Sequence, residues 1–86
     1  MTETRGQGKW LTLGELARAA KVSVRSLQYY LLLGLIEEDT RSSGGRRLFA
    51  QSAIRRVKLI AKLNRGGYHL RDIRDTFLRH PRKPTM

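Results

Sequence analysis

The stretch VSVRSLQYYLLLGL, residues Val22 to Leu35, decides the fold of this chain. Ser23 is a residue type that caps helices, because its hydroxyl accepts a hydrogen bond from a backbone N–H two or three residues later. Gly34 suits the left-handed conformation in which many helices end. Three residues between them recur at three- and four-residue spacing, as a buried stripe requires: Leu27, Tyr30 and Leu31. The stretch therefore predicts a helix at 23–33.

The other side of this expected helix carries Arg25, Gln28 and Tyr29, whose side chains end in hydrogen-bonding groups. An α-helix fits the major groove of B-DNA, where arginine pairs with guanine edges and glutamine with adenine edges. We therefore expect helix 23–33 to read the major groove. The alternative interpretation is an ordinary exposed helix face.

A second helix is expected just before this one. Thr12 and Glu15 have the T-x-x-E spacing of a capping box, in which each side chain satisfies a free backbone N–H. They predict a helix at 13–20 that directs Arg18 outward and buries three apolar residues: Leu16, Ala17 and Ala20. Lys21 and Val22 then form a short turn, so the two helices make a helix-turn-helix.

After Gly34 the apolar pattern changes to a period of two, which is typical of strands. Leu35–Glu37 and Arg47–Phe49 are expected to pair as a β-hairpin over 35–49, with turn formers at 42–45. The hairpin tip carries three arginines: Arg41, Arg46 and Arg47. Such a hairpin is interpreted as a wing that contacts a phosphate backbone or a minor groove. Alternatively, the arginines only keep an exposed strand edge from pairing with other chains.

Helical spacing returns from about Ser52, stops at Gly66 and Gly67, and resumes from Leu70 to about Arg79. The residues expected to face inward are Ile54, Val57, Ile60 or Ala61, Leu63 or Asn64, Leu70, Ile73 and Phe77. Trp10 is expected to pack at the start of the core. The predicted fold class is mainly α with a small β-hairpin wing: a winged helix-turn-helix with four helices.

Eighty-six residues suffice for one small domain. We expect it at 10–80, between a flexible N-terminal arm at 1–9 and a disordered tail at 81–86. There is no cysteine, which excludes disulfides and thiolate metal sites and fits a reducing cytoplasm. The N-terminus lacks the apolar core of a signal peptide, and no apolar run is long enough to span a membrane.

The formal net charge of +11 is the strongest compositional signal. A field of this strength attracts polyanions and opposes self-association, and nucleic acid is the obvious polyanion. A solvated basic surface, or an origin in an arginine-rich proteome, is the alternative. A membrane surface is not expected to be a partner, because the apolar residues are needed for the core of so small a domain.

Nothing in the sequence predicts an enzyme, a cofactor or a metal site. The seven carboxylates are spread over the arm, a helix cap, an exposed run at 37–39 and the start of the fourth helix, so no catalytic pair is expected. His69 and His80 have no companion acid cluster, and His69 is expected to cap the fourth helix.

Three strings together resemble the DNA-binding domain of bacterial MerR-type transcription regulators: LTLGELARAAKVSVRSLQYYLLLGLI, GGRRLF and LNRGGYHLRDI. The resemblance covers roughly Trp10 to Leu78. It implies binding of double-stranded DNA, RNA polymerase at a promoter as a further partner, and a second wing at Asn64 to Tyr68. Family members dimerise through a long helix after this domain, and the sequence here ends in PRKPTM without that helix.

Four positions depart from the family pattern. Gln28 replaces the usual arginine, Leu31 replaces an acidic residue, Arg46 replaces a tyrosine, and Ala50 replaces a serine or threonine that would cap the third helix. Glutamine at position 28 favours adenine over guanine as the base that is read. The candidate DNA-binding residues are Arg18, Lys21, Arg25, Gln28, Tyr29, Arg46, Arg47, Asn64, Arg65 and Tyr68. Two alternatives to a cytoplasmic transcription regulator stay open: a protein-interaction adaptor of MerR-like fold, as in modulators of chaperones, and an excisionase-like architectural DNA-binding factor.

Overall fold

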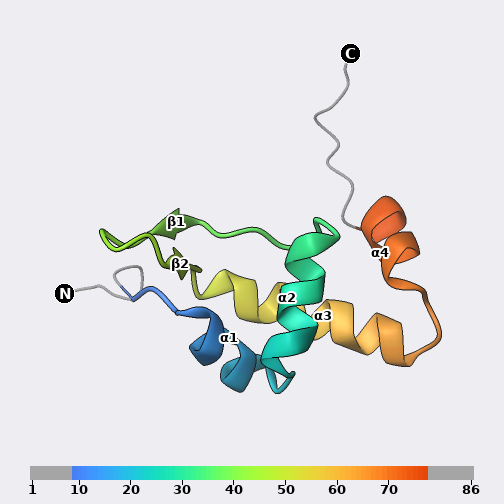
Figure 1. Cartoon of the computed structure of the whole chain (residues 1–86). Coiled ribbons are helices and arrows are strands. Elements are labelled where there is room, and N and C mark those ends of the chain that lie inside the picture. The colour runs from blue at the N-terminus through green and yellow to red at the C-terminus, as the bar shows by residue number, and fades with distance from the viewer. Residues whose placement is uncertain (1–8, 78–86) are drawn as a thin grey trace, which may run out of the picture.

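The computed structural model describes residues 9–77, which form four helices and one antiparallel hairpin (Figure 1). The elements are α1 Leu13–Ala20, α2 Val24–Leu32, β1 Thr40–Arg41, β2 Arg47–Leu48, α3 Ser52–Arg65 and α4 Leu70–Phe77. This confirms the predicted fold class. The predicted arm, apart from Lys9, and the predicted tail lie outside the described residues, and the domain bounds 10–80 stay a prediction.

The capping box at the start of α1 forms as predicted. The Thr12 N–H donates to Glu15 Oε1 at 2.9 Å, and the Glu15 N–H donates to Thr12 Oγ1 at 3.2 Å. The bond from the Thr12 backbone is the main reason that the pKa of the Glu15 carboxyl lies below its usual value. Helix α1 ends at Ala20, and the next residue, Lys21, caps it in a left-handed conformation with φ of 61°.

Helix α2 also begins and ends as its residue types predict. The Ser26 N–H donates to Ser23 Oγ at 2.9 Å, so Ser23 caps the helix. Gly34 lies just beyond α2 with φ of 79°. Leu27 and Tyr30 are buried and Leu31 is partly buried, which confirms the predicted stripe. Burial also raises the pKa of the Tyr30 hydroxyl.

The first strand was predicted too early in the chain. Leu35 and Ile36 are both buried, with exposed fractions of 1% and 4%, so the alternation expected of a half-buried strand at 35–37 is absent there. These residues lie in a connection that fills the core. The hairpin instead pairs Thr40 with Leu48 and Arg41 with Arg47, so only the second strand is where the pattern placed it.

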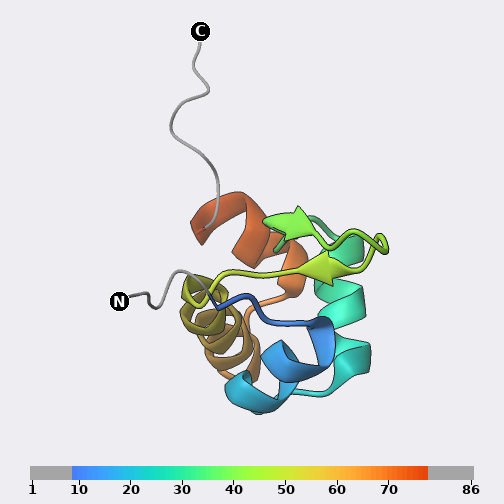
Figure 2. The same cartoon turned by 90° about the vertical axis from the view of Figure 1, so that its left-hand side faces the viewer.

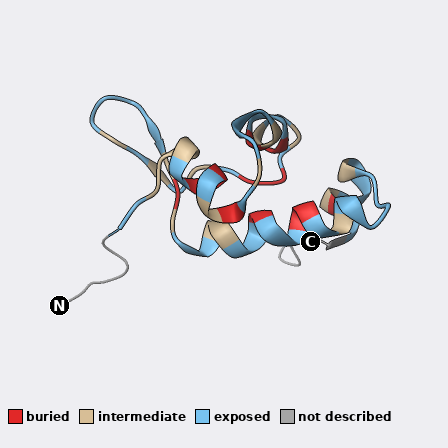
Figure 3. Ribbon diagram, turned by 90° about the horizontal axis from the view of Figure 1, so that it is seen from below, coloured by how far each residue is buried: buried red, intermediate tan, exposed pale blue. Residues whose placement is uncertain are grey.

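The core lies between the helices, where the buried residues in Figure 3 face one another. Phe49 is fully buried at its centre, and Phe49 and Leu11 exchange two backbone hydrogen bonds of 2.8 Å. The predicted inward face of α3 is confirmed by the buried side chains of Val57, Ile60 and Ala61, whereas Asn64 is exposed. Trp10 does not pack as predicted, because 44% of its surface is exposed.

Helix α4 is fixed by one apolar contact and one polar contact. Ile73 is fully buried in the core, and Arg74 Nη1 donates to the Leu33 carbonyl, just after α2, at 3.0 Å. The Ile73 N–H bonds to the His69 carbonyl at 3.0 Å, which places His69 at the start of α4 as predicted. The prediction for Phe77 concerns a side chain outside the described part.

Helix α2 occupies the middle of one side of the molecule. In Figure 1 the hairpin extends to one side of α2 and α4 lies on the other. Figure 2 shows α2 and the hairpin on the same side, with α3 on the opposite one. In the region 9–77, no helix has both the length and the apolar character needed to cross a membrane.

Candidate nucleic-acid interface

Helix α2 presents one polar face to solvent. Arg25, Gln28 and Tyr29 are exposed, because Leu27 and Tyr30 turn the opposite side of the helix into the core. We call the surface formed by Arg25, Gln28 and Tyr29 the α2 face. It contains a guanidinium, an amide and a hydroxyl, and Tyr29 keeps 50% of its surface exposed.

Two predicted residues lie at the N-terminal side of α2. Arg18 is exposed in the last turn of α1, and Lys21 is exposed in the turn between the two helices. Within residues 9–77 neither side chain forms a hydrogen bond or an ion pair. Both cations are therefore available to an anionic ligand beside α2.

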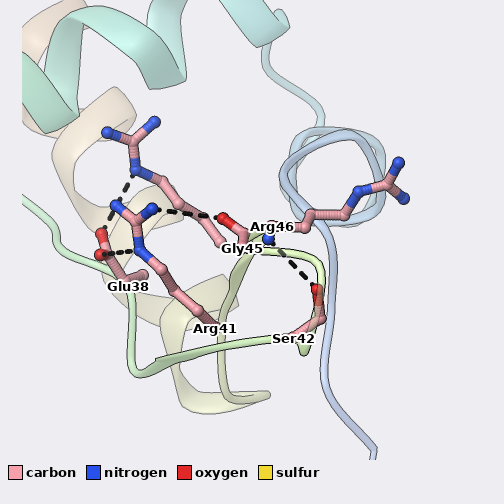
Figure 4. Close-up of polar contacts among 6 residues, drawn as sticks. Glu38, Arg41, Ser42, Gly45 and Arg46 are labelled. Atoms are coloured by element: carbon pink, nitrogen blue, oxygen red, sulfur yellow. Dashed lines mark hydrogen bonds and ion pairs between the residues drawn. The ribbon is translucent and has the colours of Figure 1, made fainter.

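The hairpin arginines are not equivalent, because Glu38 binds two of them. Glu38 Oε2 accepts from Arg41 Nε at 3.0 Å (Figure 4), and Glu38 Oε1 lies 3.3 Å from Arg47 Nε. Arg41 Nη1 also donates to the Gly45 carbonyl at 3.2 Å. Hydrogen bonding from Arg41 holds the pKa of the Glu38 carboxyl below its usual value. We call Glu38, Arg41 and Arg47 the Glu38 group.

The exposed acidic run predicted at 37–39 is therefore wrong for Glu38, whereas Glu37 and Asp39 are exposed as predicted. Glu38 is partly buried against the arginines, and Asp39 Oδ2 accepts the Ala50 N–H at 2.8 Å, where the hairpin meets α3. These contacts span the hairpin, so neighbouring residues in the sequence did not indicate them. Both carboxylates stabilise the wing.

Arg46 is the hairpin arginine outside the Glu38 group. Its backbone N–H donates to Ser42 Oγ at 3.1 Å, whereas its side chain extends away from Glu38 (Figure 4). Among the described residues its guanidinium has no hydrogen bond or ion pair. Arg46 therefore presents a full positive charge to solvent.

The predicted second wing is a turn between α3 and α4. Asn64 Nδ2 donates to the Tyr68 carbonyl at 2.8 Å, and Gly67 adopts a positive φ of 109°. Tyr68 is 49% exposed. Arg65 lies close enough to Tyr30 of α2 to act on the pKa of its hydroxyl. Asn64 therefore shapes the turn with its amide.

A hollow of about 400 Å³ joins the α2 face to this turn. Its lining includes Tyr29 from α2 and Asn64 from α3, so two predicted residues meet there. It also includes His69 and Arg71, which the sequence analysis did not select. Their position directly after the Gly66-Gly67 turn was the available signal. The hollow is large enough for a phosphate group and contains several hydrogen-bond donors.

A solvent-facing helix after a tight turn, with a basic hairpin beside it, defines a winged helix-turn-helix protein. The comparison with known families agrees. Residues 11–79 match the profile described as MerR HTH family regulatory protein, so this chain belongs to the MerR family. The family consists of regulatory proteins, which confirms the expectation that the chain is not an enzyme.

Curated relatives include nodulation protein NolA of Bradyrhizobium sp. (strain NC92), which is 36% identical over 74 residues, 86% of this chain and 31% of NolA. The transcriptional regulator ZntR of Escherichia coli K12 is 35% identical over 63 residues, 73% of this chain and 45% of ZntR. This chain therefore spans less than half the length of either relative.

Among solved structures, HiNmlR is a MerR family regulator lacking the sensor domain, bound to promoter DNA. It matches 78% of this chain and 53% of its own, with 25% identity and a TM-score of 0.69. MtaN, the N-terminus of a Bacillus subtilis multidrug transporter activator, matches 84% of this chain and 67% of its own, with 25% identity and a TM-score of 0.74.

Proposed function

We propose that this chain is a sequence-specific regulator of transcription that binds double-stranded DNA. The observation that carries the proposal is the exposed α2 face, Arg25, Gln28 and Tyr29, on a helix that lies on the same side of the molecule as the basic hairpin (Figure 2). The MerR membership and the promoter DNA bound to HiNmlR support the same function. DNA in bacteria lies in the cytoplasm, which is where this protein would act.

Helix α2 would enter the major groove with Arg25 and Gln28 toward the base edges. Arginine and glutamine are the residue types that bind guanine and adenine there in bidentate fashion. Gln28 is exposed, and its amide is not used by another described residue, so both of its polar atoms are available. Gln28 would thus contribute to base preference.

The remaining candidates would bind the sugar–phosphate backbone. Arg18 and Lys21 flank one end of α2, and the hairpin supplies Arg46 and Arg47. On the α4 side, Tyr29, His69 and Arg71 line the hollow, and all three side chains can donate to phosphate oxygens. Arg65 and Tyr68 would add contacts from the second wing, with Asn64 holding its shape.

Two further partners belong to the proposal. A regulator of this kind would act on RNA polymerase at a promoter. Dimerisation would match a two-fold DNA site to a two-fold protein, as in other helix-turn-helix dimers. No contact in the described region favours the adaptor or the excisionase-like function over this one.

The test begins with selection of duplexes from a random library by the purified chain, followed by titration of the selected and scrambled duplexes at several salt concentrations. With about six phosphate contacts, affinity should fall on the order of a thousandfold between 50 and 200 mM salt. Failure to bind any duplex at low salt would refute the proposal. A single protein captured in place of DNA would favour the adaptor.

Variants then separate base contacts from backbone contacts. Gln28→Ala should reduce the difference in affinity between the selected and the scrambled duplex. Arg46→Ala should instead lower the affinity for both duplexes by the same factor. Arg55→Ala is the matched control for Arg46, because Arg55 is also an exposed arginine but lies on α3, on the other side of the molecule from α2 (Figure 2). It should change binding least of the three.

A further inference from the structure

Leu32 is the most exposed large apolar side chain of residues 9–77. It is 78% exposed, whereas Tyr29, the next in order, is 50% exposed. Its neighbours in the sequence, Leu31 and Leu33, are partly buried against the core, so the exposure is not shared by the whole leucine run. The hydrophobic pattern of α2 is satisfied without Leu32, and its side chain has no packing role in this fold.

Helical geometry puts Leu32 on the same side of α2 as the α2 face, at the C-terminal end of the helix. Each residue of an α-helix is rotated by about 100° from the one before, so Leu32, seven residues after Arg25, points within about 20° of it. The same rule places Leu32 about 40° from Gln28 and about 60° from Tyr29. Leu32 thus extends the row of side chains that the proposed function directs into the major groove.

The major groove offers one apolar partner for such a side chain. Base edges there present hydrogen-bond donors and acceptors, except for the C5-methyl group of thymine. Gln28, one helical turn before Leu32, suits the N6 and N7 edge of adenine. An A·T pair and its neighbour can therefore satisfy both side chains, the amide through hydrogen bonds and the leucine through the methyl group.

We propose that Leu32 is a specificity-determining residue that contacts a thymine methyl group next to the base that Gln28 reads. The inference rests on the proposed function and deepens it, because it assigns an A·T-containing element to the major-groove site. Contact with a second copy of the chain is less favoured. Leu32 shares its helix face with the polar side chains of Arg25, Gln28 and Tyr29, so the face lacks the continuous apolar patch that a contact between two copies would bury.

The experiment removes the methyl group from the DNA rather than only the side chain from the protein. Duplexes selected by the full chain are synthesised again with deoxyuridine in place of thymine, one position at a time, and titrated. At one position, loss of the methyl group should lower the affinity of the wild-type chain for the duplex about fourfold. This is the effect expected for burial of one methyl-sized group. Leu32→Ala should bind the thymine and deoxyuridine duplexes equally.

Leu59→Ala is the matched control, since Leu59 is a leucine on α3 that is 44% exposed. It should keep the full response to deoxyuridine. Leu32→Ala should fold normally, because alanine is the stronger helix former and no core contact is lost. Thermal melting checks this point.

Three outcomes would overturn the inference. The wild-type chain could bind all deoxyuridine duplexes as well as the thymine ones, or Leu32→Ala could keep the full response. Sedimentation could instead show that Leu32→Ala separates a dimer while the methyl group has no effect, which would make Leu32 a protein contact. Binding without a methyl response refutes only this inference, whereas failure to bind any duplex refutes the proposed function as well.

Discussion

Replacing Glu38 by glutamine should make DNA binding more sensitive to salt. In the Glu38 group one carboxylate lies 3.0 Å from Arg41 Nε and 3.3 Å from Arg47 Nε. Arg46 stands outside this group. The three arginines and one glutamate of the hairpin therefore present a net charge near +2 to a phosphate backbone rather than +3.

The size of the effect follows from counterion release. Each neutralised phosphate changes the slope of log affinity against log salt by about 0.9. With a net charge near +2, the hairpin should thus contribute about 1.8 to this slope in the wild type. With a net charge near +3, it should contribute about 2.7 in Glu38→Gln. Over a fourfold change in salt, from 50 to 200 mM, the added 0.9 corresponds to an extra loss of affinity of about 3.5-fold.

The assay is a fluorescence anisotropy titration of one duplex at four or more salt concentrations. Glu37→Gln is the matched control, because it removes the same charge from an exposed neighbour that has no ion pair with a described residue. It should change the slope by less than half as much. Equal slopes for the two variants, or weaker binding of Glu38→Gln at every salt concentration, would refute the reasoning.

Three further predictions concern stability. Ser23→Ala should lower the free energy of unfolding by about 1 kcal/mol through loss of the α2 cap, whereas Ser52→Ala, at an exposed serine that caps no helix, should have little effect in thermal melts. Gly34→Ala should destabilise the protein by about 1 kcal/mol because of the φ of 79° at this position. Gly14→Ala, inside α1 with nothing within 4 Å of the new Cβ, should stabilise it by a similar amount. A stabilising Gly34→Ala together with a destabilising Gly14→Ala would contradict this. Burial raises the pKa of Tyr30 above 10.0, so the unfolded chain releases this proton first and stability should fall as pH rises past that value. In alkaline denaturation, the stability of Tyr30→Phe should fall less steeply with rising pH than that of the wild type. The same pH dependence in both proteins would show that Tyr30 does not contribute to it.

Local signals accounted for most of the fold. The capping box of Thr12 and Glu15, the cap at Ser23 and the turn at Gly34 each depend on residues a few positions apart, and all three form as predicted. The first strand did not, because Leu35 and Ile36 are buried by contacts with distant elements. Alternation in a short segment cannot distinguish a strand from a buried connection.

The candidate site was less accessible to sequence reasoning. The exposure of Arg25, Gln28 and Tyr29 followed from helical spacing alone. The division of the hairpin arginines by Glu38 did not, because it depends on the register that pairs Arg41 with Arg47. The hollow between α2 and α4 depends on the docking of Arg74 on the Leu33 carbonyl, 41 residues away in the sequence.

The most direct test of the central claim is an NMR titration of the ¹⁵N-labelled chain with a selected duplex. The account predicts that the largest amide shifts fall on α2 from Arg25 to Leu32 and on the hairpin around Arg46. The exposed side of α3, represented by Arg55 and Lys58, should change little. Shifts concentrated on α3, with α2 unaffected, would contradict the account.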